Sequence, residues 1–243
     1  MSATTRTRFR AAIVATAPAV LLAGFVYHPH IPYPDPALVA AAATSDTTRW
    51  GLSHLAVGVG SGLAVLAFLA IQSYLGEAGE EPWGVLAVPF IVMGSTLFTL
   101  LPGMELAVLA AADTGADVQA AQTALMPWFV PILLTGAVTF ALGVLGFARG
   151  IARSGVLSPR LTRLVAGALV IMAAARFVPL GIVQFYVGGA AGIAALWPLA
   201  YEMWQHTEAR PAGQPAIDAT DAGGLVVPPS AGTGERRWSE PRT

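Results

Sequence analysis

The chain has few charged residues and lacks Cys and Lys altogether. Charged residues make up 11% of the sequence, against roughly 25% in soluble proteins. All thirteen basic residues are Arg, because there is no Lys. The absence of Cys excludes disulfides, thiolate metal sites, iron–sulfur clusters and lipidation of a cysteine. A net charge of −1 gives no electrostatic basis for binding nucleic acid, so we expect no nucleic-acid partner.

Apolar residues are abundant and occur in long uninterrupted stretches. They make up 55% of the 243 residues, and several stretches are long enough to cross a hydrocarbon core of ~30 Å. Inside a bilayer the backbone can satisfy its own hydrogen bonds as α-helices. We therefore predict an all-α, polytopic transmembrane helix bundle that has the lipid bilayer as its surroundings.

About six helices fit the apolar pattern. The segment 164–204 is too long for one crossing, and Pro179 and Gly181 supply a turn that divides it into two. Residues 1–10 are expected to form a cytoplasmic segment, 11–206 the bundle, and 207–243 a disordered cytoplasmic tail rich in Pro, Gly and charge. The predicted helices are residues 11–27, 51–75, 83–112, 127–148, 161–178 and 182–204.

The distribution of Arg predicts the orientation. Cytoplasmic loops of membrane proteins carry an excess of basic residues. Six crossings put the N-terminal Arg residues, the four Arg of segment 149–163 and Arg210 on one side, and leave Arg49 in a loop on the other. We therefore expect both ends of the bundle to lie in the cytoplasm.

Several polar residues that are far apart in the sequence fall at the predicted outer ends of helices. Residues of this kind inside membrane segments usually face the bundle interior and are often functional. The candidate binding cluster on the outer side consists of His54, Glu105, Arg176 and Gln184.

Arg176 is the most informative member of this cluster. It follows Leu164 by about 12 residues, which places it about 18 Å into the membrane. An unpaired Arg at such a depth costs at least ~2.5 kcal/mol on insertion scales. Helical side chains lean toward the N-terminus of their own helix, so Glu105 leans toward the level of Arg176. We predict an ion pair between Glu105 and Arg176, with Gln184 as a further ligand.

Two histidines, His28 and His30, follow the first predicted helix. Together with His54 and Glu105 they offer ligand types that suit zinc or copper, and these four residues are the metal candidates. A His pair in a Pro-rich loop is more often only a polar loop, so the metal assignment stays open. No cofactor is predicted, because haem usually needs His residues deeper on facing helices. No phosphate-binding, dinucleotide or hydrolase motif is present in the sequence.

Short segments carry a resemblance to other proteins: Tyr27-His28-Pro29, Trp50-Gly51-Leu52-Ser53-His54-Leu55 and Arg176-Phe177-Val178-Pro179-Leu180-Gly181. In these segments the chain resembles a group of uncharacterised six-helix membrane proteins of actinobacteria and haloarchaea. The resemblance covers the bundle and not the tail. It implies a multi-pass protein of a bacterial or archaeal cell membrane, and it implies no particular activity.

Three functions are compatible with the sequence. The first is a non-enzymatic membrane protein whose outer-facing polar pocket binds or passes a small solute or ion. The second is a structural or accessory subunit whose intramembrane charges only fix helix packing, and the third is a membrane-embedded enzyme. An open pocket lined by His54, Glu105 and Arg176 would favour the first, whereas a sealed and mutually paired cluster would favour the second. The sequence carries no signal for an oligomeric state.

Overall fold

The computed structural model describes residues 2–33, 35–80 and 82–208, which belong to one compact unit. The predicted tail, 207–243, lies outside the described residues except for its first two, which end the last helix. The helices are α1 (Ala3–Tyr27), α2 (Pro36–Ser45), α3 (Thr47–Glu77), α4 (Pro82–Thr114), α5 (Val118–Ser154), α6 (Pro159–Ala175), the π-helix η1 (Ile182–Val187) and α7 (Gly188–Glu208).

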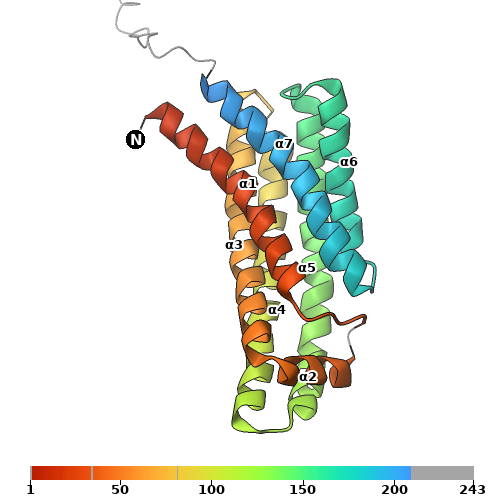
Figure 1. Ribbon diagram of the computed structural model, residues 1–243. Coiled ribbons are helices and arrows are strands. Elements are labelled where there is room, and N and C mark those ends of the chain that lie inside the picture. The colour runs from red at the N-terminus through yellow and green to blue at the C-terminus, as the bar shows by residue number, and fades with distance from the viewer. Residues whose placement is uncertain (1, 34, 81, 209–243) are drawn as a thin grey trace, which may run out of the picture. The chain divides into compact units, whose positions relative to one another are not determined.

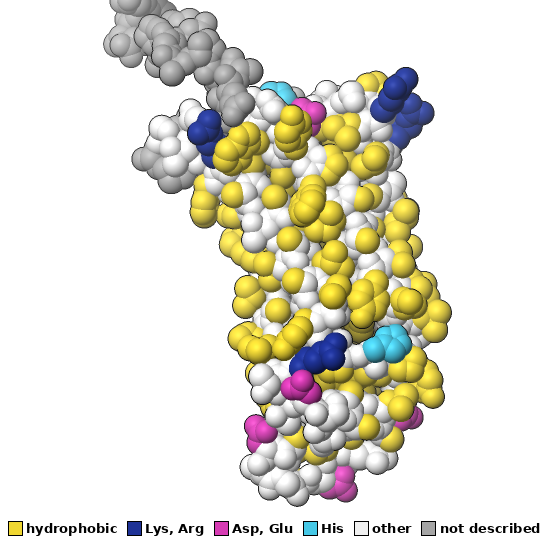
Figure 2. All heavy atoms as spheres, in the orientation of Figure 1, with side chains coloured by type: hydrophobic (Ala, Val, Ile, Leu, Met, Phe, Trp, Pro, Cys, Tyr) yellow, Lys and Arg dark blue, Asp and Glu magenta, His cyan; other side chains and the backbone are white. Residues whose placement is uncertain are grey.

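The predicted fold class is confirmed in the described part of the chain, which contains helices and no strands. Five helical stretches there are long and apolar enough to cross a membrane, and the shorter α6 is the sixth helix of the bundle. The chain is therefore an integral membrane protein with several spanning helices. Figure 2 shows hydrophobic side chains over the middle of the described part, and charged side chains toward its two ends.

The long helices form a ring in which neighbours in sequence are neighbours in space. Contacts run from α1 to α3, α4, α5, α6 and α7 in turn, and α7 packs back against α1 (Figure 1). The short α2 lies across one end and packs on α3, α4 and α5. We call this end the α2 end. We call the opposite end the terminal end, because α1 begins there and α7 finishes there. At this end the guanidinium carbon of Arg8 lies 5.2 Å from the ring centroid of Trp204.

Aspartate side chains fix the start of three helices at the α2 end. Asp35, Asp46 and Asp117 accept hydrogen bonds of 3.0, 2.9 and 2.9 Å from main-chain N–H groups in the first turns of α2, α3 and α5. Such caps satisfy donors that a helix start leaves unpaired. At the terminal end α5 stops at Gly155, whose φ of 66° is left-handed, and Pro159 opens α6.

The helices differ in length from the predicted ones at specific points. α1 begins at Ala3 rather than at residue 11. α5 begins at Val118 rather than at residue 127, and both Pro127 and Pro131 lie inside it. Proline is tolerated within membrane helices, since neighbouring groups can satisfy the freed carbonyls. α6 ends at Ala175, and a turn and η1 precede α7. The 17 residues of α6 span about 25 Å, whereas the 37 residues of α5 span about 55 Å. The hairpin of α4 and α5 therefore extends past the turn between α6 and α7 (Figure 1).

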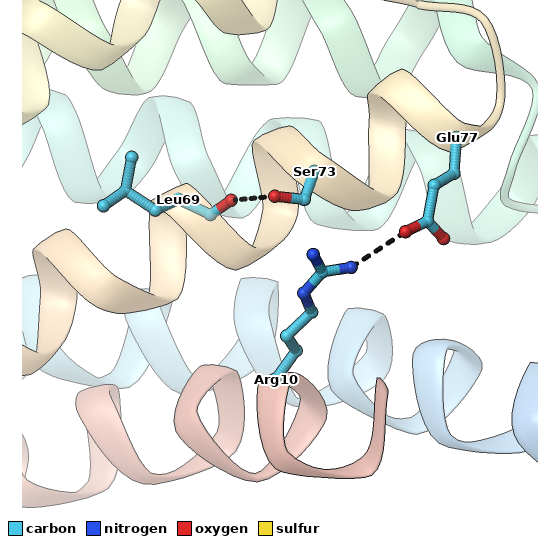
Figure 3. A network of polar contacts seen from close by, with 4 residues as sticks. All are labelled: Arg10, Leu69, Ser73 and Glu77. Atoms are coloured by element: carbon cyan, nitrogen blue, oxygen red, sulfur yellow. Dashed lines mark hydrogen bonds and ion pairs between the residues drawn. The ribbon is translucent and has the colours of Figure 1, made fainter. Parts of the chain in front are cut away.

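Ion pairs join helix ends at the terminal end of the ring. Arg10 of α1 donates to Glu77 at the end of α3 at 2.8 Å, and Ser73 donates to the carbonyl of Leu69 at 3.0 Å one turn earlier (Figure 3). Arg153 of α5 lies 3.8 Å from Glu80. The Glu77 side chain is 60% exposed, so its pair with Arg10 stabilises the fold by at most ~1 kcal/mol. The tight packing of the helices contributes more to the stability of the fold than this exposed ion pair does.

Glycines permit the close approach of paired helices. A Cβ added to Gly94 of α4 would lie 2.5 Å from the backbone nitrogen of Phe140 on α5, which is nearer than real Cβ atoms approach. Gly103 on the same helix faces open space, with nothing within 4 Å of an added Cβ. The two positions therefore provide a matched pair for testing the α4–α5 contact.

We expect Gly94→Ala to lower stability by about 1–3 kcal/mol, because the extra methyl forces α4 and α5 apart. Gly103→Ala should leave stability unchanged or raise it slightly through its higher helix propensity. Thermal unfolding of both variants in the same detergent measures the difference. Equal stability of the two variants would contradict the close α4–α5 packing.

The orientation is tested with single cysteines, since the natural chain has none. Ala116, between α4 and α5, and Ser158, between α5 and α6, are both exposed and lie at opposite ends of the ring. If the α2 end faces outward, a membrane-impermeant maleimide labels Ala116→Cys in intact cells and labels Ser158→Cys only after permeabilisation. The reverse pattern would overturn the predicted orientation.

Candidate functional site

A cavity of about 340 Å³ lies inside the ring at the α2 end. It is partly open, and its lining is mostly apolar. Its volume is in the range of small-molecule sites, roughly 300–1,000 Å³. α1, α2, α3, α4, α5, η1 and the loops after α1 and α6 all contribute to its wall.

Three helices line the cavity with stripes of residues spaced by three or four, so each stripe follows one face of its helix. Apolar side chains dominate the stripes. Polar residues stand at the ends of the α4 and α5 stripes and within the α3 stripe. The stripes are Trp50, His54, Val57, Ser61 and Ala64 on α3, Ser95, Phe98, Pro102 and Glu105 on α4, and Gln122, Met126, Phe129, Leu133, Ala137 and Phe140 on α5.

Arg176 reaches the cavity from the end of α6, where the ring is shortest. α6 spans about 25 Å, less than the ~30 Å hydrocarbon core, so Arg176 at its end falls within the core if α6 begins at the membrane surface. Its guanidinium carbon is 5.6, 4.9 and 5.8 Å from the ring centroids of Phe25, Phe98 and Phe140. These rings come from α1, α4 and α5, so three helices surround one cation with aromatic faces.

The predicted ion pair between Glu105 and Arg176 is not formed. Glu105 instead accepts a hydrogen bond of 3.2 Å from the Gln122 side chain of α5. It follows Phe98 by two helical turns, about 10 Å along α4, whereas Arg176 lies against Phe98 itself. The two charged residues thus line one cavity at different levels. Gln184 does not bind the guanidinium either, because its side chain donates to the main-chain carbonyl of Arg176 at 3.3 Å.

Four polar side-chain atoms on the cavity wall are buried without a hydrogen-bond partner in the described part of the protein. They are Ser95 Oγ, Glu105 Oε2, Gln122 Oε1 and Arg176 Nε. A fifth such atom among the described residues, Glu80 Oε1, lies elsewhere. Unsatisfied buried polar atoms are rare in native proteins, and here they gather around one cavity.

Two histidines form an aromatic cluster with Trp50 near the α2 end. His28 lies after α1 and His54 on α3, with ring centroids 4.9 Å apart, and the Trp50 ring lies tilted against that of His54 with centroids 4.5 Å apart. Each imidazole Nδ1 donates to a main-chain carbonyl, that of Pro29 at 2.6 Å for His28 and that of Trp50 at 2.7 Å for His54. In the neutral rings this leaves each Nε2 as an acceptor.

The metal candidates do not come together as a set. His30 is exposed and does not line the cavity, whereas His28, His54 and Glu105 do. Within the described residues no three His, Asp or Glu side chains are close enough together to hold a metal ion. The loop 28–33 directs His28 inward and leaves His30 at the surface, so a two-residue spacing does not produce a shared site here.

The sequence did not point to several residues of this wall. Ser95 and Gln122 are obscured by their surroundings, since a single Ser in an apolar helix is common, and Gln122 falls between the predicted helices 83–112 and 127–148. The phenyl rings around Arg176 depend on the rotation of three helices, which the apolar pattern alone does not fix. Ser95 stands at helical spacing from Glu105 on α4, and this spacing was the available signal.

Comparison of the chain with protein-family models, with curated proteins and with solved structures finds no match. The function is therefore argued from the cavity and its residues.

The histidine cluster predicts a pH dependence of stability. Burial lowers the pKa of His28 below its ordinary value of 6.5; the bond to the Pro29 carbonyl opposes this, and the positive charge of Arg49 adds to the lowering. The unfolded chain therefore takes up a proton near pH 6.5 that the folded protein does not, and stability falls as the pH drops below about 6.5.

We expect His28→Asn to reduce this loss, so that its Tm falls less than that of the natural protein between pH 7.5 and 5.5. A difference of a few degrees is expected, since ~1 kcal/mol shifts Tm by roughly 2–4 °C at this size. His30→Asn is the matched control, because His30 is exposed and outside the cavity. Identical pH profiles for all three proteins would contradict the assignment.

Proposed function

We propose that this membrane protein binds a small, largely apolar ligand inside the cavity at its α2 end. The observation that carries this proposal is the group of four unpartnered polar atoms, on Ser95, Glu105, Gln122 and Arg176, around an apolar space. A buried polar atom without a partner costs about 1–3 kcal/mol. A ligand with an apolar body and polar groups at separate points would satisfy these atoms and fill the space.

The state of the charged residues favours binding over a role in packing alone. A cluster that only locks helices together would pair its charges with each other. Here Glu105 interacts with the Gln122 amide and Arg176 with phenyl rings, and neither finds an opposite charge. An accessory subunit is therefore the second candidate.

Closed packing below the cavity favours binding over passage through the ring. Toward the terminal end the interior is filled by a cluster of buried side chains that includes Phe68, Phe147, Leu169, Met172 and Leu199. This cluster leaves the α2 end as the side of access. We place the protein in a bacterial or archaeal cell membrane with the α2 end outward, on the distribution of Arg and the short motifs described above.

A large side chain placed in the cavity should block binding. Leu133 lines the cavity on α5, whereas Leu142 on the same helix is 50% exposed and lies outside it. We expect the natural protein to bind about one molecule of the neutral probe dodecanol, and Leu133→Trp to reduce its affinity at least tenfold. Leu142→Trp should bind as the natural protein does.

Native mass spectrometry of protein released from nanodiscs counts the bound dodecanol directly. Thermal unfolding of each variant checks that the substituted helix still packs. Equal occupancy in the Leu133→Trp and Leu142→Trp proteins would show that the probe binds outside the cavity, and would refute the proposed site.

A further inference from the structure

The cavity wall has a single full positive charge. Arg176 is the one Arg or Lys among the described residues that line it, and its Nε is buried without a partner. No carboxylate of the described residues pairs with it. A guanidinium stays charged in proteins, so this cation is held within the membrane without an internal anion.

The surroundings of Arg176 orient it without neutralising it. The faces of Phe25, Phe98 and Phe140 are within 6 Å of the guanidinium carbon and attract a cation through their quadrupoles. They cannot accept the N–H donors of the guanidinium edge as a carboxylate can. The hydrogen bond from Gln184 to the Arg176 carbonyl at 3.3 Å fixes the backbone at the same point. The arginine is therefore preorganised, with its Nε donor still to be satisfied.

The rest of the wall shows which anion would fit. A guanidinium binds a carboxylate or a phosphate through two parallel hydrogen bonds. At the guanidinium a singly charged head group balances the local charge, whereas a doubly charged phosphate would add excess negative charge to a wall that also carries the carboxyl groups of Asp35 and Glu105. Between Arg176 and the polar residues near the α2 end the wall is apolar, with Met126, Phe129 and Leu133 of α5, and suits a hydrocarbon chain.

We propose that the ligand of this cavity is an amphiphile with a carboxylate head, and that Arg176 binds the carboxylate. This inference rests on the proposed function and adds the chemical class of the ligand. The carboxylate is the counter-ion that the folded chain does not supply, and the α5 stripe contacts its chain. Arg176 is then a specificity-determining residue that separates charged from neutral amphiphiles of the same length.

The test compares dodecanoate with dodecanol, which share a chain length and differ in the head group. Affinities are measured by native mass spectrometry on the full-length protein released from nanodiscs. We expect dodecanoate to bind the natural protein at least tenfold more tightly than dodecanol. Arg176→Gln should lower the affinity for dodecanoate at least tenfold and leave that for dodecanol unchanged.

Two further variants guard against a trivial loss of binding. Arg176→Lys keeps the charge but loses the two parallel hydrogen bonds of the guanidinium, so its affinity for dodecanoate should fall three- to tenfold. This variant keeps the proposal testable if Arg176→Gln does not fold. Arg149 lies over the ring of Trp83, at 5.8 Å, and does not line the cavity. Arg149→Gln is the matched control and should bind dodecanoate as the natural protein does.

The outcomes separate the two proposals. Equal affinity for the two probes, with no effect at Arg176, would overturn the carboxylate assignment and leave the apolar binding site in place. Tighter binding of dodecyl phosphate than of dodecanoate would also overturn it, in favour of a phosphate head. Binding of neither probe to the natural protein would refute both the assignment and the proposed function.

Discussion

The hydrocarbon core of a membrane offers no hydrogen-bond partner, and the arrangement of this chain follows from that constraint. The backbone satisfies itself in helices, and the ring from α1 to α7 closes on itself without an open side. Polar side chains in the spanning segments then have only the interior of the ring to occupy. Ser95 and Glu105 of α4 and Arg176 at the end of α6 all face inward for this reason, although α4 and α6 are far apart in the sequence.

Much of the fold could be predicted because lipid imposes a simple pattern. Apolar length gives the number of helices, and the break at Pro179 and Gly181 divides the last long segment as expected. Helix ends outside the core were less predictable. A helix was predicted to begin at residue 127, whereas α5 begins at Val118, is capped by Asp117 and continues through Pro127 and Pro131. In a chain that extends beyond the bilayer, hydropathy no longer marks where a helix stops.

The candidate site was only partly accessible from sequence. His54, Glu105, Arg176 and Gln184 were grouped from topology alone, and they line one cavity, while their role in binding stays a prediction. The partner of Arg176 could not be deduced. A carboxylate is the obvious choice by charge, but the rotation of α1, α4 and α5 brings phenyl faces to the guanidinium instead. The spacing of residues in the sequence determines which side chains share one face of a helix. It does not determine which residues of the neighbouring helices that face contacts.

If α6 begins at the membrane surface, Arg176 at its end lies part-way across the bilayer, because the helix, at about 25 Å, is shorter than the ~30 Å hydrocarbon core. A charge at that depth lies within the electric field of the membrane potential, which acts on one elementary charge with about 2.3 kcal/mol per 100 mV over a full crossing. An anion that travels from the α2 end to Arg176 moves through a part of this field. The occupancy of a carboxylate bound as proposed would therefore change with membrane voltage as well as with its concentration, and the energised state of the cell would be one of the variables that set how full the site is.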